Sequence, residues 1–319
     1  MKKATKAWLI AAGILILTGC VLFAVLLSGL KWDFSKLSTG KYETNIYEAD
    51  KTFGNISFTT DTADIFFALS DDGKCRVECY EEENAKHFVS VEDDILTVKI
   101  NDKRAWYDYI GFNFESPKIT VYLPETEYNA LLIEECTGNV ELPKDCSFGS
   151  VDISVTTGNV NIFAAIRDEA KVKTSTGNIR AENISAETLD FSVTTGTVTV
   201  SNVVCKGDVS VNVSTGKANL TDISCKTLTS SGSTGNLSLN NVIAEEMMSV
   251  KRSTGDISVK DCDAAEIYMK TSTGSVFGNF LSDKVFVTDT GTGSVNVPET
   301  VTGGKCEIKT STGDIKITK

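Results

Sequence analysis

A single histidine, His87, occurs in the 319 residues, and it is the first residue to consider for chemistry. One histidine excludes His-rich metal sites and weakens any Ser-His or Cys-His catalytic hypothesis. Acidic side chains are numerous, but no pair recurs in phase to indicate a metal ladder or the two carboxylates of a glycosidase. Cys-x-x-Cys is absent, which disfavours a structural zinc or redox motif. We therefore predict no catalytic residue, no metal ligand, no cofactor and no enzymatic activity.

The densest aromatic stretch of the chain is the best candidate for a contact with a ligand or partner. Aromatic faces stack on sugars and anchor protein interfaces. The alternative, which we favour, is that these side chains seal one end of a hydrophobic core. The residues are Trp106, Tyr107, Tyr109, Phe112 and Phe114.

A Thr-Gly dipeptide recurs at intervals of 19 or 20 residues and indicates the element that must carry any site. An apolar residue always stands two positions after the glycine, and another usually follows two positions later, which is the alternation of a short strand with one buried face. The glycine is expected at a turn of positive φ. We predict an all-β fold, a single-stranded parallel β-solenoid (β-helix or β-roll) of 19–20-residue coils stacked at about 4.8 Å. The ten glycines are Gly138, Gly158, Gly177, Gly196, Gly216, Gly235, Gly255, Gly274, Gly293 and Gly313.

The Ser/Thr-Thr-Gly units form an outward array of hydroxyl groups in this fold. Such an array could bind a glycan, a partner or ice, but small residues and hydroxyls also suit a tight turn, which is the interpretation we favour. The final coil ends on residues 315–319, and we expect its lysines to guard an open edge against pairing with other chains.

Nine cysteines are present, and two of them share a phase of the repeat. Cys205 and Cys225 each lie nine residues after a repeat glycine and should stack in adjacent coils, within reach of a disulfide bond. Buried free thiols, serving as small core residues, are the alternative that we favour.

Residues 8–30 carry no charge and follow an N-terminus with three lysines. At about 1.5 Å per residue the run spans roughly 34 Å, enough for a bilayer core of about 30 Å. The lysines place residues 1–7 in the cytoplasm and the rest of the chain outside a cell membrane that it crosses once. A cleaved signal, for which the run is long, is one alternative. The other is a lipoprotein signal processed at Cys20, although this would leave apolar residues where a lipidated cysteine normally begins a polar tether.

The chain after this transmembrane helix divides into two regions. Residues 31–130 are less regular and are expected to form an N-terminal β subdomain or degenerate capping coils, because terminal repeats are usually atypical. Residues 131–319 hold the ten repeats and are expected to form the solenoid. With 43 acidic against 31 basic residues, the net charge of −12 argues against a nucleic-acid partner.

Several features together resemble a bacterial family described as "putative adhesin", a domain of unknown function with β-strand repeats and LiaG-like relatives. They are the apolar N-terminus, residues 33–37, 62–65 and 106–109, and the repeated Ser/Thr-Thr-Gly-Asn/Asp-Ile/Val units. The resemblance implies a membrane-anchored, extracytoplasmic β-solenoid and carries over no catalytic residue.

Three functions are compatible with this reading of the sequence. The first is a non-catalytic cell-surface scaffold or adhesin-like module that contacts a cell-wall glycan or a partner. The second is an accessory protein of a cell-envelope stress response that acts on a membrane sensor protein. A glycan-processing enzyme is the third and least favoured, because the outward positions lack clustered acids.

Overall fold

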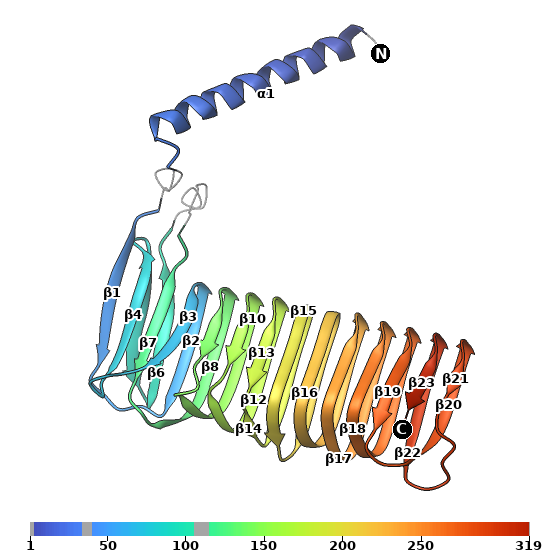
Figure 1. Ribbon diagram of the computed structural model, residues 1–319. Helices are drawn as coiled ribbons and strands as arrows, with labels where there is room; N and C mark the ends of the chain where they lie inside the picture. Colours follow the sequence, from blue (N-terminus) through green and yellow to red (C-terminus); the bar gives the residue numbers. More distant parts are fainter. Residues whose placement is uncertain (1–2, 34–39, 105–114, 319) are drawn as a thin grey trace.

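The computed structural model describes residues 3–33, 40–104 and 115–318, which form one apolar helix and a long β-solenoid (Figure 1). The helix is α1 (Lys3–Gly29), and its apolar stretch, Trp8–Gly29, is long enough to cross a membrane. Nearly all of this stretch is exposed, and Leu27, close to its end, is the one buried residue within it.

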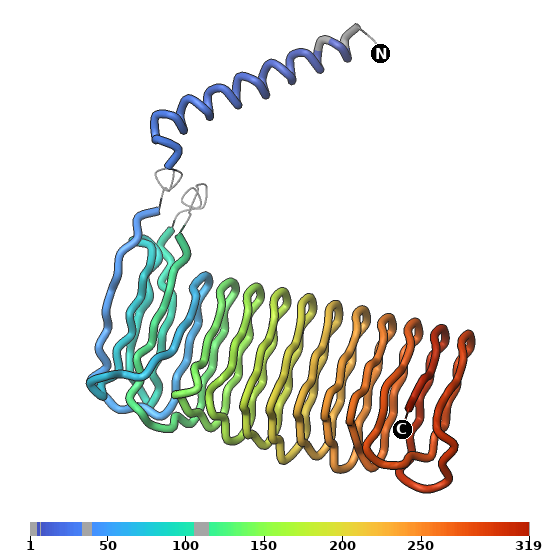
Figure 2. The backbone as a smooth tube through the Cα atoms, viewed as in Figure 1, coloured from blue at the N-terminus to red at the C-terminus, as the bar shows by residue number. Residues whose placement is uncertain are grey.

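The solenoid confirms the predicted fold class. Its coils run side by side as parallel strands (Figure 2). The strands from the first Thr-Gly unit onward are β8 (Glu127–Thr137), β9 (Val140–Leu142), β10 (Ser147–Thr157), β11 (Val160–Ile162), β12 (Ala165–Thr176), β13 (Ile179–Glu182), β14 (Ser185–Ala186), β15 (Thr188–Cys205), β16 (Asp208–Thr234), β17 (Leu237–Thr254), β18 (Ile257–Thr273), β19 (Val276–Phe280), β20 (Lys284–Thr292), β21 (Val295–Asn296), β22 (Gly304–Thr312) and β23 (Ile315–Thr318).

The apolar phases of the repeat become continuous columns inside the solenoid. Ile153, Val172, Phe191 and Val211 are register partners in successive coils, and each is buried. The alternation read from the sequence therefore places every second side chain of a strand in one common core. Each Å² of apolar surface that is buried there stabilises the fold by about 25 cal/mol.

The repeat glycines adopt the positive φ that the sequence predicts. Gly216 has φ of 139°, and a Cβ atom there would lie 1.7 Å from the carbonyl oxygen of Gly196 in the neighbouring coil. Both the backbone conformation and the close approach of the coils therefore require glycine.

Two ladders of polar side chains join neighbouring coils at their turns. The Oδ1 atom of Asn139, directly after a repeat glycine, accepts the backbone N–H of Asn159 at 3.0 Å, and Asn159 accepts that of Asn178 in the same way. A second ladder lies six positions after the glycines, where Asn241 donates to Asp222 at 2.6 Å and both residues have left-handed φ. Asparagine and aspartate suit the first ladder because their side-chain oxygens accept from backbone N–H groups, and the second because they tolerate the left-handed conformation.

The coils at the C-terminal end do not stack in sequence order. Strand β22 lies between β18 and β20, and β23 lies between β19 and β21, so the last segment of the chain is inserted one coil before the end (Figure 1). The prediction of lysines along an open edge at residues 315–319 is therefore wrong. Ile315 and Ile317 are buried inside the stack, and β20 with β21 forms the terminal coil.

The N-terminal end shows a similar departure from sequence order. Strands β2 (Asn55–Thr62) and β3 (Asp64–Leu69) form the first coil of the stack, against β8 and β9. On their other side lie β6 (Ile95–Asp102) and β7 (Lys118–Leu123). Strands β2, β3, β6 and β7, together with β1 (Tyr42–Ala49), β4 (Cys75–Glu82) and β5 (Ala85–Glu92), form a partly antiparallel assembly that we call the cap.

Candidate functional site

The buried acids and the histidine gather in and beside the cap. Among the described residues, the buried Glu81, Glu82, His87 and Glu135 lie in the cap or at its junction with the first coils, whereas the buried bases Arg252 and Lys284 lie in the solenoid. A buried charge is costly unless it is paired, so this concentration marks the cap as the region where function is most readily placed.

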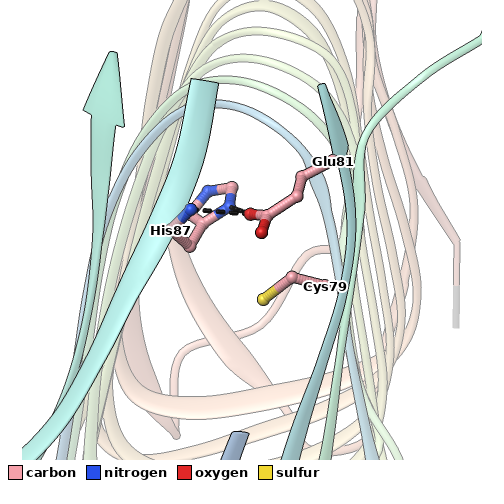
Figure 3. A group of neighbouring side chains, drawn as sticks. All are labelled: Cys79, Glu81 and His87. Carbon is pink, nitrogen blue, oxygen red and sulfur yellow. Dashed lines mark hydrogen bonds and ion pairs between the residues drawn. The ribbon is translucent and has the colours of Figure 1, made fainter. Parts of the chain in front are cut away.

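His87 faces Glu81 across the interior of the cap (Figure 3). The imidazole Nδ1 lies 2.7 Å from Oε2 of Glu81, and the backbone N–H of His87 donates to the same oxygen at 2.6 Å. Burial acts to raise the pKa of Glu81, but the hydrogen bonds from His87 and Asn45 outweigh it and lower the pKa. The carboxylate is therefore ionised, and it orients the imidazole.

The other oxygen of Glu81 is satisfied from strand β1. Its Oε1 atom accepts the side-chain amide of Asn45 at 2.8 Å and the hydroxyl of Tyr47 at 3.4 Å. Burial, with the nearby carboxylate, raises the pKa of Tyr47 to about 12. Cys79, two residues before Glu81 on the same face of β4, is also fully buried, and burial raises the pKa of its thiol.

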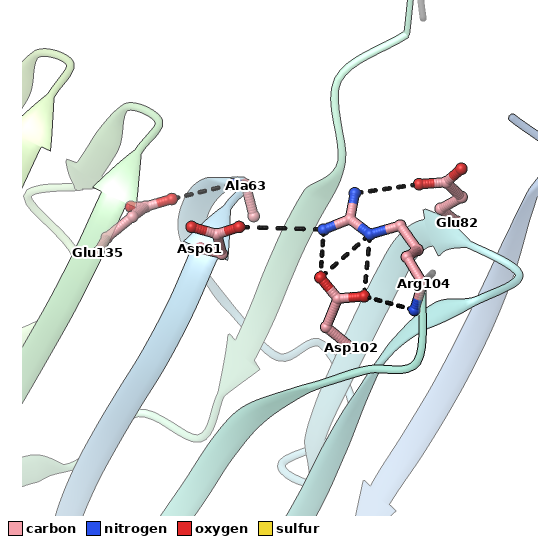
Figure 4. A network of polar contacts seen from close by, with 6 residues as sticks. All are labelled: Asp61, Ala63, Glu82, Asp102, Arg104 and Glu135. Carbon is pink, nitrogen blue, oxygen red and sulfur yellow. Dashed lines mark hydrogen bonds and ion pairs between the residues drawn. The ribbon is translucent and has the colours of Figure 1, made fainter. Parts of the chain in front are cut away.

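A cavity of about 280 Å³ adjoins His87. Arg104 lines it and is held by carboxylates on three strands or their ends: Asp102 at 2.6 Å, Glu82 at 3.3 Å and Asp61 at 3.9 Å (Figure 4). Because the positive charge of Arg104 is shared among three acids, the described residues that line this cavity offer no free cation to an anionic ligand.

Glu135, on β8, is buried where the cap meets the solenoid (Figure 4). Its Oε1 atom accepts the backbone N–H of Ala63 at 3.0 Å. Its Oε2 atom and the Oγ1 atom of Thr60 are buried without a hydrogen-bond partner among the described residues. Burial raises the pKa of Glu135 to about 8, with a further contribution from the charge of Asp64. The group is therefore mostly protonated at neutral pH.

A larger cavity, of about 480 Å³, lies at the other end of the cap strands. Phe53 and Tyr128 stack with ring centroids 5.6 Å apart and both line it. The exposed residues Lys51 and Lys74 stand at its rim, opposed by the single acid Asp50 among the lining residues. An aromatic wall with two ammonium groups can hold a ring-shaped ligand that carries negative charge.

The predicted aromatic contact residues cannot be placed against these cavities. Trp106, Tyr107, Tyr109, Phe112 and Phe114 all lie outside the described residues. Their role as a contact for a ligand or partner stays a prediction.

The predicted cysteine pair does stack in adjacent coils. Cys205 and Cys225 occupy the same register position in two adjacent coils, and both are buried free thiols. Each Sγ atom lies against a backbone carbonyl oxygen, that of Glu187 for Cys205 and that of Ile243 for Cys225. A disulfide bond between them stays a prediction.

Buried threonines directly before the Ser-Thr-Gly units join neighbouring coils. Each lies three residues before a repeat glycine and donates to the carbonyl oxygen of the glycine in a neighbouring coil, as Thr271 does to Gly255 at 3.0 Å and Thr310 to Gly274 at 2.9 Å. The role of the outward Ser/Thr-Thr-Gly hydroxyls themselves stays a prediction.

Sequence reasoning missed both cavities and the cluster around His87. The residues that line the larger cavity come from segments up to 75 positions apart, such as Phe53 and Tyr128, and no motif connects them. A weak signal existed in the alternation of Cys79 and Glu81 on one strand near the only histidine of the chain.

Comparison with known families decides the affiliation of the chain. Residues 53–221 and 206–319 match the family described as Toastrack DUF4097. The chain belongs to this family. Its Toastrack domain thus covers the cap from β2 onward and the whole solenoid, and the family affiliation agrees with the resemblance drawn from the repeats.

Solved structures share the Toastrack fold at low sequence identity. A "putative lipid binding protein" from Parabacteroides distasonis is 20% identical with a TM-score of 0.50, over 77% of this chain and 98% of its own. A "putative adhesin" from the same organism is 13% identical with a TM-score of 0.50, over 88% of this chain and 98% of its own. A search of curated proteins gave no match. These likenesses show the fold alone.

Proposed function

We propose that this Toastrack protein is a membrane-anchored, non-catalytic surface module that binds an acidic cell-wall glycan in the cavity beside Phe53. The observation that carries the proposal is the pairing of an aromatic wall with Lys51 and Lys74 in a chain whose net charge is −12. A local positive rim on an acidic protein selects an anionic ligand, and an aromatic wall suits the apolar face of a sugar ring.

The N-terminal helix supports a place at the cell surface. Its apolar stretch Trp8–Gly29 is nearly all exposed, with Leu27 alone buried, so a bilayer would bury a surface that the protein itself leaves open. Lys2, Lys3 and Lys6 precede the stretch and favour a cytoplasmic N-terminus, with the Toastrack domain outside. The names of relatives described as adhesins agree with a binding role.

The engagement of the titratable groups supports a non-catalytic role. Within the described residues, Arg104 is shared by three acids, and Glu81 accepts hydrogen bonds from β1 and β5. A general acid or base must be within reach of a substrate proton, whereas these two groups contact neighbouring side chains and backbone of the protein.

Binding of the full-length protein in lipid nanodiscs to purified cell-wall polysaccharide tests the proposal. Phe53→Ala, and separately Lys51→Ala with Lys74→Ala, should weaken binding by about 1–2 kcal/mol, or roughly tenfold in Kd. Lys217→Ala is the matched control, because Lys217 is equally exposed but lies on the solenoid far from the cavity. Equal binding by all the variants would refute the proposal, and capture of a membrane sensor protein without glycan binding would support the regulatory alternative.

A further inference from the structure

Three side chains of metal-binding type converge inside the cap, on two strands that face each other. Cys79, Glu81 and His87 each offer one ligand atom, and these atoms all lie within 4.8 Å of one another. All three residues are buried. Figure 3 shows the imidazole of His87 on one strand, and the thiol and carboxylate on the other, directed into the same space.

We propose that this cluster binds one divalent transition-metal ion of the zinc class through Sγ of Cys79, a carboxylate oxygen of Glu81 and Nδ1 of His87. Thiolate, imidazole and carboxylate are the ligands that such ions take in proteins, and three protein ligands leave a fourth position open. Magnesium and calcium are disfavoured, because they require oxygen ligands.

Charge balance favours occupancy by a divalent ion. A thiolate and a carboxylate carry two negative charges, which a divalent cation neutralises, so the buried complex has no net charge. Binding releases the thiol proton of Cys79 to solvent. The imidazole stays neutral, and its single proton moves from Nδ1 to Nε2 as Nδ1 coordinates the metal.

The surroundings of His87 can accommodate this change. Its Nε2 atom is buried without a hydrogen-bond partner among the described residues, so the proton that Nε2 gains displaces no existing hydrogen bond there. His87 also lines the cavity of about 280 Å³, which has room for water as the fourth ligand. The present distance of 2.7 Å between Nδ1 and Oε2 of Glu81 must open to roughly 3.3 Å, the separation of two ligands about 2.0–2.1 Å from a tetrahedral zinc.

The position of the cluster gives the ion a structural purpose. Strands β4 and β5 share a single ladder pair, Glu82 with Ala85, next to the turn that joins them. Beyond that pair β4 joins β1 and β7 while β5 joins β6, so the two strands lie on opposite walls of the cap. A metal ion between Glu81 and His87 would fasten these walls together, and its binding free energy would stabilise the folded cap.

Titration of the full-length protein with Co²⁺, in detergent micelles and after treatment with a chelator, tests the proposal. The protein must carry no polyhistidine tag, because His87 is the only histidine of the natural sequence. We expect one Co²⁺ per chain, a thiolate-to-cobalt charge-transfer absorption, loss of that absorption when Zn²⁺ displaces Co²⁺, and a rise in Tm with Zn²⁺.

Two variants and one control locate the ion. Cys79→Ser should abolish the charge-transfer absorption, and both Cys79→Ser and His87→Gln should weaken Zn²⁺ binding by about 100-fold or more, since loss of even an outer contact to a metal ligand costs 10–100-fold. Cys262→Ser replaces another buried thiol that is outside the cluster and should change neither result.

The proposal would be overturned by the absence of saturable binding at one equivalent, or by a charge-transfer absorption that persists in Cys79→Ser. Circular dichroism establishes that each variant keeps its β-structure. If His87→Gln does not fold, Cys79→Ser alone decides the outcome, because no hydrogen bond of that thiol is lost with the sulfur.

Discussion

Glu135 is expected to make the protein less stable as the pH rises, which is the reverse of the usual behaviour of a carboxyl group. Burial raises its pKa from the ordinary 4.5 to about 8. Between these values the folded protein binds more protons than the unfolded chain. The stabilising effect of protonation is therefore complete below pH 4.5 and is lost as the pH rises through about 8.

The magnitude follows from the two pKa values. With 4.5 in the unfolded chain and about 8 in the folded one, this single group lowers the free energy of unfolding by roughly 3 to 4 kcal/mol between pH 5 and pH 8. Glu135→Gln removes the titration and keeps a carbonyl oxygen for the backbone N–H of Ala63. The stability of the variant relative to the natural protein should thus rise by that amount over the same interval.

Urea unfolding of the full-length protein in micelles, followed by circular dichroism at pH 5 and pH 8, measures this difference. Glu134→Gln is the matched control, because Glu134 is the exposed neighbour on the same strand and should leave the pH dependence unchanged. Parallel pH profiles for Glu135→Gln and the natural protein would refute the reasoning, since they would mean that Glu135 ionises normally in the folded state.

Three other changes test the fold. Gly216→Ala should destabilise the protein by several kcal/mol, measured by urea unfolding, because its Cβ atom would meet a carbonyl oxygen at 1.7 Å, whereas Gly73→Ala, with positive φ but open space around it, should cost only about 1 kcal/mol. Phe191→Ala should cost about 3–5 kcal/mol by the same assay, while the exposed Val204 should tolerate alanine within about 0.5 kcal/mol. Deleting residues 304–319 removes strand β22, which pairs with β18 on one side and β20 on the other, so hydrogen exchange should rise in β18 through β21. Unchanged exchange in these strands would contradict the inserted order of the coils.

The coils could be predicted from the sequence because their determinants are local. Each unit carries its own turn glycine and alternating strand, so a coil such as that around Gly216 is specified by about twenty consecutive residues. The second ladder was overlooked although its signal is equally periodic: Asn202, Asp222 and Asn241 each lie six positions after a repeat glycine.

The order of the last coils could not be read from the period, because the inserted unit has the same spacing as the others. A signal was present in the composition of β20. Its inward residue Thr288 is in register with the buried Ile308 and, one coil further in, with the buried Met269, where the preceding coils place apolar side chains. Polar inward residues are expected in a terminal coil, which has no further neighbour to cover them.

The cap depends on contacts that local patterns do not encode. Strand β4 pairs antiparallel with both β1 and β7, and these pairings bring together segments that are far apart in sequence. The cavity beside Phe53 and the cluster at His87 both arise from such pairings. The single histidine and the absence of Cys-x-x-Cys therefore predicted no metal ligand, and no sequence pattern pointed to the cavity, although the folded chain brings both sets of residues together.

Hydrogen exchange of the full-length protein in nanodiscs, with and without saturating cell-wall polysaccharide, tests the central claim most directly. We predict added protection in three segments that line the larger cavity, residues 49–53, 73–75 and 124–128, with the solenoid unchanged. Binding that protects the turns of the solenoid instead, or that leaves these three segments unaltered, would contradict the assignment of the cap as the binding site.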